Sequence, residues 1–60
     1  MNEEQEKVFE QLENQVNIIN FTPIQALTMV LTIYKGGGYY DHLDESQFEA
    51  VVKAFVEKYM

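Results

Sequence analysis

The sequence predicts an all-α fold, a small three-helix bundle with dimerisation as one way of completing its core. Three segments each begin with a helix-capping signal and continue with apolar residues spaced three and four apart. Alternation of apolar and polar residues over four or more positions is absent, so no strand is predicted. Sixty residues allow one domain, residues 1–60.

The first predicted helix runs from Glu3 to Asn17 or Ile19. Asn2 is placed to cap it, and Gln5 stands three residues later, which is the spacing of a capping box. Spacings of three and four predict one buried stripe on this helix, made by Phe9, Leu12, Val16 and Ile19.

The second predicted helix begins at Pro23, with Thr22 as its cap and Gln25 closing the box, and continues to about Lys35. Three glycines, residues 36–38, end it. Its apolar residues cover most of the circumference, and a helix of this kind is buried nearly all round. Its polar residues form one narrow stripe: Gln25, Thr28, Thr32 and Lys35. Any apolar surface that the other two helices leave bare should therefore contact another chain.

The third predicted helix runs from Glu45 to about Tyr59, with Asp44 as its cap and Gln47 closing the box. Leu43 and Phe48 occupy the two positions of a hydrophobic staple around this start. The predicted apolar face consists of Phe48, Val51, Val52, Phe55 and Tyr59.

The segment 36–43 is the one long predicted loop, and it carries the adjacent aromatic residues Tyr39 and Tyr40. Exposed tyrosines are enriched at interface hot spots because they are large, rigid and amphipathic. One alternative is that both rings contact a partner protein. The other is that one ring covers the core and the second lies flat on the surface.

The residues from Asp41 to Ser46 include an acid, a base and a hydroxyl, but they do not predict a catalytic site. A nucleophilic site needs groups brought from separate elements around a pocket, whereas these lie within six residues and Asp44 is required as a helix cap. The chain has no Cys and only one His, His42, so no metal site is predicted. We therefore expect no enzyme activity and no cofactor.

The formal net charge of −6 disfavours direct binding to nucleic acid or to an anionic membrane, because both carry negative charge. The N-terminal residues are acidic and lack the apolar region of a secretory signal, and cysteine is absent, so a cytoplasmic location is expected. Arg is absent and residues with A/T-rich codons are plentiful, which suggests a low-GC bacterium or its phage.

Four carboxylates form a row on the first predicted helix, at spacings of i, i+3, i+7 and i+10: Glu3, Glu6, Glu10 and Glu13. One interpretation is a face that keeps a small protein soluble. The alternative is a docking face for a basic protein surface, because a row of negative charges can imitate a nucleic-acid backbone.

Self-association is predicted because a single chain of this size has little stability margin. A hydrophobic gain of about 90 kcal/mol is offset by a conformational-entropy cost of about the same size. A homodimer is a common remedy. The predicted contact lies on the second helix or on the outer side of the third, with Met29, Ile33, Val56 and Met60 as candidate residues.

Together these features predict a small acidic protein–protein interaction module, an adaptor, inhibitor or regulatory subunit that acts through helical faces and forms a homo-oligomer. A narrower alternative is an acidic, nucleic-acid-mimicking inhibitor of a DNA- or RNA-binding protein or enzyme. The two differ in where the partner binds.

Overall fold

The computed structural model describes residues 1–36 and 42–60 of the chain. Three helices make up the fold: α1 (Glu3–Asn17), α2 (Pro23–Gly36) and α3 (Glu45–Tyr59). No strand occurs among the described residues. The predicted all-α three-helix bundle is confirmed, and each helix begins at the predicted residue.

The same hydrogen-bonded device starts all three helices. In each, a capping side chain accepts a hydrogen bond from the backbone N–H three residues later. The side-chain oxygen of the glutamine at that position accepts a second hydrogen bond, from the backbone N–H of the cap residue. The pairs are Asn2 with Gln5, Thr22 with Gln25, and Asp44 with Gln47. Two backbone donors that no helical carbonyl can reach are thereby satisfied at each start.

The first helix stops at Asn17, before the two isoleucines that follow it. Asn20 adopts a left-handed backbone conformation with φ of 67°, which asparagine tolerates better than most residues. The N–H of Phe21 then donates to the carbonyl of Gln15 at 2.9 Å and turns the chain toward α2. Because the helix has ended, the side chains of Ile18 and Ile19 remain 71% and 57% exposed.

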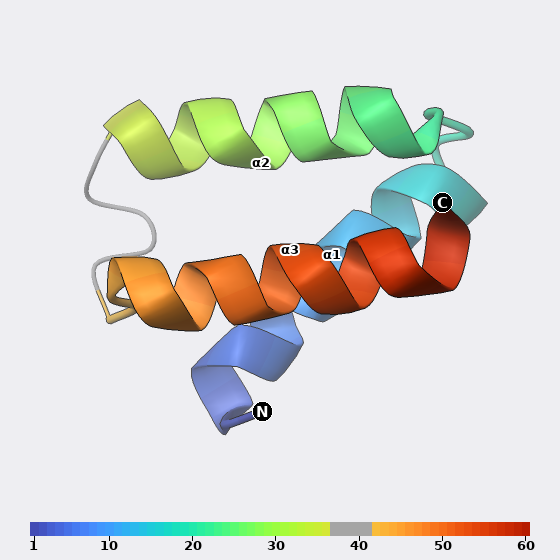
Figure 1. Ribbon diagram of the computed structural model, residues 1–60. Coiled ribbons are helices and arrows are strands. Elements are labelled where there is room, and N and C mark those ends of the chain that lie inside the picture. The colour runs from blue at the N-terminus through green and yellow to red at the C-terminus, as the bar shows by residue number, and fades with distance from the viewer. Residues whose placement is uncertain (37–41) are drawn as a thin grey trace.

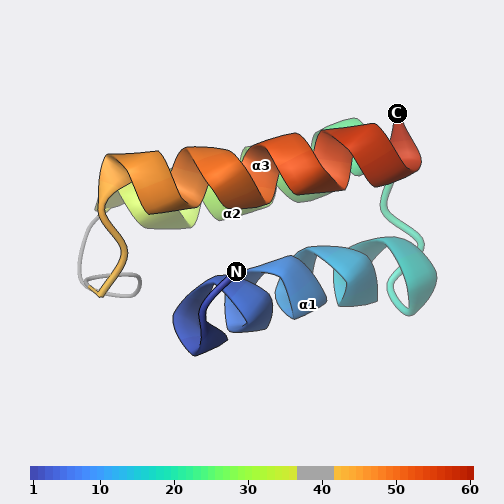
Figure 2. The ribbon, with the colours of Figure 1, turned by 60° about the horizontal axis from the view of Figure 1, so that its bottom comes forward.

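The three helices are arranged as a two-helix layer with the third helix on one side of it. Figure 1 shows α2 and α3 running antiparallel to each other, and Figure 2 shows α1 beneath this pair. The first helix packs against both others, whereas α2 and α3 touch each other least. Within residues 1–36 and 42–60, no helix covers the side of the α2–α3 layer opposite α1.

The core lies between α1 and this layer. Its fully buried side chains are Val8, Leu12, Ala26, Val30, Leu43, Phe48, Val51 and Phe55. Leu43 and Phe48 are both buried, as the predicted staple at the start of α3 requires. The core thus draws on all three helices and on the residue that precedes the cap of α3.

The apolar stripe predicted on α1 is confirmed only in part, because Leu12 is fully buried but Ile19 is exposed. The residues that point inward are Gln5, Val8, Leu12 and Gln15. Phe9 and Val16 are only partly buried beside them, and Ile19 lies beyond the helix in solvent. Two glutamines therefore occupy core-facing positions that an apolar pattern does not reveal.

The polar stripe predicted on α2 faces solvent, since all four of its residues are exposed. The hydroxyls of Thr28 and Thr32 donate to backbone carbonyls four residues earlier, each at 2.8 Å. The expectation that α2 is buried nearly all round is not met within one chain. Ile24, Met29 and Leu31 are 58%, 43% and 41% exposed, so apolar surface remains on both sides of the polar stripe.

Candidate protein interaction surface

A groove lies between α2 and α3, and we call it the α2–α3 groove. Its volume is about 480 Å³. Residues of both helices line it: Leu31, Tyr34, Lys35, Glu45, Phe48, Glu49, Val52, Lys53 and Val56. None of them belongs to α1, which agrees with the position of α1 on the other side of the layer.

Two aromatic rings close one end of the groove. The rings of Tyr34 and Phe48 stack with their centroids 4.2 Å apart and an interplanar angle of 9°. Stacking at this distance adds to the burial energy of both rings and ties α2 to α3 where they otherwise touch little. Further along, the side chains of Leu31, Val52 and Val56 provide an apolar lining.

The spacing of residues on α3 explains how one helix serves both the core and the groove. Glu45, Glu49, Val52 and Val56 follow one another at i, i+4, i+7 and i+11 and so share one side of the helix. The buried residues Phe48, Val51 and Phe55 lie on the adjacent side, toward α1 and α2. The groove side is thus acidic near the start of α3 and apolar near its end.

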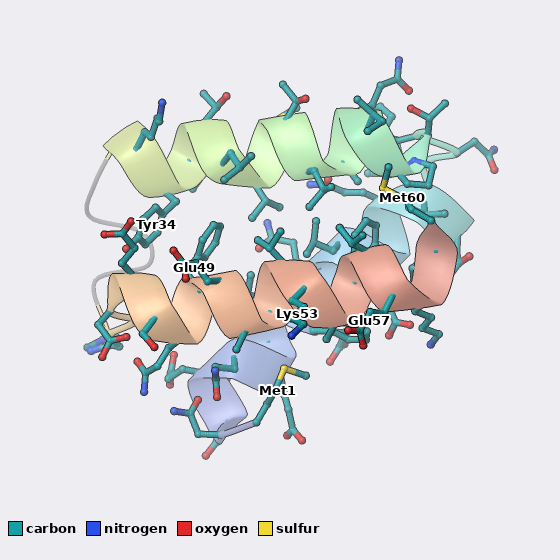
Figure 3. All side chains as sticks on the ribbon, viewed as in Figure 1. Met1, Tyr34, Glu49, Lys53, Glu57 and Met60 are labelled. Atoms are coloured by element: carbon teal, nitrogen blue, oxygen red, sulfur yellow. The ribbon has the colours of Figure 1, made fainter. Side chains whose placement is uncertain are left out.

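Charged side chains gather at the end of the groove where α2 finishes and α3 begins. Lys35 comes from the last turn of α2, while Glu45 and Glu49 come from the first turns of α3. In Figure 3, Tyr34 and Glu49 lie at this end and Lys53 lies further along α3. The lining contains two lysines and two glutamates, so its formal net charge is zero although the chain carries −6.

The predicted carboxylate row on α1 divides into two parts. Glu3, Glu6 and Glu10 are exposed, and within the described part of the chain their carboxylates form no ion pair. Glu13 instead points to α3, where Lys58 and the hydroxyl of Tyr59 both donate to its Oε2 atom. The structure therefore leaves three carboxylates free for a partner and uses the fourth to hold α1 against α3.

The hydrogen bond from Lys58, followed by that from Tyr59, lowers the pKa of the Glu13 carboxyl below its ordinary value of 4.5. The same contact raises the pKa of Lys58 above 10.5. A lowered carboxyl pKa means that Glu13 stabilises the fold above its unfolded-state pKa, and that this contribution is lost as the pH falls through the folded-state value.

We expect Glu13→Gln to flatten the acid side of the stability profile. In the wild type, the urea midpoint should fall between about pH 6 and pH 3 partly because Glu13 becomes protonated. The variant lacks this group, so its midpoint should fall less over the same range. Glu10→Gln is the matched control, since it removes an exposed carboxylate of the same helix. Equal slopes for the two variants would contradict the role given to Glu13.

The structure does not gather the predicted self-association residues into one patch. Val56 lines the α2–α3 groove. Met29 lies on the other side of α2, in a second hollow of about 490 Å³ that Phe21 and Ile24 also line. Ile33 is partly buried against the core, and Met60 is 61% exposed at the end of α3. The candidates Tyr39 and Tyr40 lie outside the described residues.

Most of the groove, including Leu31, Tyr34 and Val52, was not predicted as a contact surface from the sequence. On α2 no signal separated Leu31 from the other apolar residues, because they surround the helix. On α3 the signal was present: Val52 and Val56 are four residues apart, and Glu49 precedes them on the same side. Val52 was assigned to the core, where it is only partly buried.

The remaining predicted features have simple structural positions. Asp44 caps α3, and His42 and Ser46 are exposed beside it. Among residues 1–36 and 42–60, no three acidic or histidine side chains lie close enough together to hold a metal ion. In the same residues, none of the helices has the length and apolar character needed to cross a bilayer.

No family model, curated protein or solved structure matches this chain.

Proposed function

We propose that this chain is a protein–protein interaction module that works through its helical faces, as an adaptor, inhibitor or regulatory subunit. The observation that carries the proposal is the α2–α3 groove. It combines an apolar lining with charged residues at its edge, and no helix of the described chain covers it.

This arrangement resembles the anatomy of a protein interface more than that of a substrate pocket. Interfaces place apolar and aromatic side chains in the middle and charged side chains around them. In the groove, Phe48, Val52 and Leu31 supply the apolar part, while Lys35 and Glu49 supply charged edges. A helix of a second chain laid along the groove would contact both.

Leu31→Lys should abolish binding through the groove, because it places a charged ammonium group on the apolar lining. Met29→Lys is a matched control: Met29 lies on the same helix with 43% exposure against 41% for Leu31, but outside the groove. We expect partners captured from the native host to be lost from the first variant and kept by the second. Circular dichroism should show both variants folded. Loss of partners from both variants, or from neither, would contradict a function through the groove.

A second candidate function is inhibition of a nucleic-acid-binding protein by charge mimicry. The specific observation in its favour is the exposure of Glu3, Glu6 and Glu10 on α1, on the other side of the molecule from the groove. It is weakened by the engagement of Glu13 with Lys58. This function would place the partner on α1 and leave the groove free.

The test of mimicry is the variant that carries both Glu6→Gln and Glu10→Gln. If α1 docks on a basic surface, its association with that partner should slow about tenfold and lose much of its salt dependence, because exposed charges act mainly through screened long-range attraction. Glu57→Gln, which changes an exposed carboxylate of α3, should have little effect. An association rate that is unchanged in the double variant would remove this second function.

A further inference from the structure

We infer that the occupant of the α2–α3 groove is the same groove of a second copy of this chain, so that two chains form a four-helix bundle from two α2–α3 layers. The inference rests on the proposed function, since it names the partner of that surface. It follows from two features of the groove, its charge and its polarity from end to end, and the antiparallel course of its two helices is compatible with it.

The charge of the groove suits a second copy better than a basic or acidic partner. Its lining carries two lysines and two glutamates, whereas the whole chain carries −6. The exposed carboxylates of α1 lie on the other side of the layer. Two chains that meet groove to groove thus keep these carboxylates apart and bring neutral, mixed-charge surfaces together, which limits the repulsion between two acidic proteins.

The polarity of the groove changes from one end to the other. Lys35, Glu45 and Glu49 lie at the end where α2 finishes and α3 begins. Val52 and Val56 lie toward the other end, with the charged residue Lys53 between them in the sequence. In a stable symmetric dimer, the charged end of one groove faces the charged end of the other, and the apolar end faces the apolar end. Charged groups placed against apolar surface would lose hydration without gaining a partner.

This requirement selects one direction for the two-fold axis. If the axis ran across the groove, the charged end of one copy would face the apolar end of the other. If it runs along the groove, each α2 lies over the α3 of the other copy, and like ends meet. Lys35 of one copy then faces Glu45 and Glu49 of the other, and at the opposite end Val52 and Val56 of each copy face the α2 helix of the other.

The same axis gives favourable helix packing. Because α2 and α3 are antiparallel within one chain (Figure 1), an axis along the groove makes each α2 antiparallel to the α3 that it covers as well. All neighbouring helices of the four are then antiparallel, which is the up-down-up-down arrangement of many four-helix bundles. The α1 helices lie outside, one on each face.

The surface area indicates that folded chains dock rather than exchange helices. The chain exposes 4073 Å², close to the ~4,000 Å² expected for a compact protein of its size. A standard interface covers about 800 Å² per partner, about one fifth of that surface. One face of an already compact domain is sufficient, and no segment has to leave its own core.

The test uses charge reversals mixed in trans. In the proposed dimer, Lys35→Glu places a negative side chain opposite Glu49 of the other copy, and Glu49→Lys places a positive side chain opposite Lys35 of the other copy. By symmetry, each of these like-charge contacts occurs twice. We expect each variant alone to dimerise about tenfold or more weakly than the wild type in sedimentation equilibrium. An equimolar mixture should form a heterodimer of nearly wild-type affinity, because both cross-chain pairs are then opposite in sign. Rescue within a single chain cannot produce this result.

Lys53→Glu mixed with Glu49→Lys is the control for the direction of the axis. An axis across the groove brings α3 over α3 and allows these two residues to pair, whereas an axis along the groove does not. In the proposed dimer this mixture keeps one like-charge contact, between Lys35 and the lysine introduced at position 49, so we expect its heterodimer to remain weaker than the wild type. Recovery here, with none in the mixture of Lys35→Glu and Glu49→Lys, would overturn the proposed arrangement.

The same measurements separate this inference from the proposed function. A wild-type chain that is monomeric at micromolar concentration overturns the dimer, and the function stands if Leu31→Lys still loses a captured host partner while Met29→Lys keeps it. A wild-type dimer that Leu31→Lys does not disrupt overturns the dimer through the groove, and the function is overturned as well only if Leu31→Lys also keeps the captured host partner. A wild-type dimer that Leu31→Lys dissociates, and that the trans mixture restores, supports both.

Discussion

Phe55→Ala should leave the chain largely unfolded at 25 °C. Phe55 has no exposed surface, and its ring contacts the ring of Tyr59 in a tilted arrangement with a centroid distance of 4.8 Å. Removing a buried phenylalanine side chain costs about 3–5 kcal/mol. A domain of 60 residues has a total stability of about 3–9 kcal/mol. The loss is therefore comparable to the whole stability.

Far-UV circular dichroism with urea titration measures this effect. The variant should show a reduced helical signal in water or a midpoint near zero denaturant. Ile18→Ala is the control, because Ile18 is 71% exposed beyond the end of α1 and its loss should change the stability by less than about 0.5 kcal/mol. A cooperative transition of Phe55→Ala at the wild-type midpoint would show that the core is not where the structure places it.

Gln15→Met should raise the stability by about 1–2 kcal/mol, which is unusual for a change in a buried residue. The Oε1 atom of Gln15 is buried without a hydrogen-bond partner, and an unsatisfied buried acceptor is destabilising. Methionine has the same unbranched length and no such acceptor. The urea midpoint should therefore rise.

Gln5→Met is the matched control, because Gln5 is buried to the same extent, at 8% exposure, but both its amide oxygen and its amide nitrogen form a hydrogen bond. Its Oε1 atom accepts from the N–H of Asn2 at 2.8 Å, and its Nε2 atom donates to the carbonyl of Gln47 at 3.0 Å. We expect this variant to lose about 1–3 kcal/mol, since the donors and acceptors left behind lose their partners. A loss of stability in both variants would refute the distinction between the two glutamines.

Local signals in the sequence were sufficient to predict the helices. Each cap and its glutamine lie within four residues, so the hydrogen bonds that start a helix do not depend on the rest of the fold. The polar stripe of α2 was also predicted correctly. These features share one property: the atoms that make them are neighbours in the sequence.

Features that depend on distant residues were not predicted. Gln5 faces inward because the carbonyl of Gln47, on α3, accepts its amide hydrogen. The carboxylate of Glu13 points to α3, unlike the other three carboxylates of the row, because Lys58 and Tyr59 lie opposite it and donate to it. Neither partner can be identified from spacing along one helix, since the choice is made by the way α1 packs against α3.

The groove was difficult to predict for a related reason. On a helix that is apolar on most sides, the pattern does not tell which apolar side chain is covered by its own chain. Ala26 and Val30 are fully buried, whereas Leu31, one position further, remains 41% exposed. The position of α1 on one side of the layer decides this, and only the assembled fold reveals it.

The two candidate surfaces are compatible in one molecule. A dimer formed through the α2–α3 grooves would carry one α1 on each outer face, with Glu3, Glu6 and Glu10 exposed on both. Such a dimer could engage a basic partner at two places at once, and two linked contacts bind far more tightly than one when the spacing fits. Self-association and partner binding would then support each other.

The central claim, that the α2–α3 groove is where two copies of this chain meet, is tested most directly by methyl NMR of the unmodified protein over a range of concentrations. The account predicts that the methyl signals of Leu31, Val52 and Val56 shift together as the concentration rises, while those of Ile18 and Met29 stay in place. Shifts confined to Met29 and its neighbours on the other side of α2, or no concentration dependence up to about 1 mM, where contacts of only ~4 kcal/mol form, would contradict it.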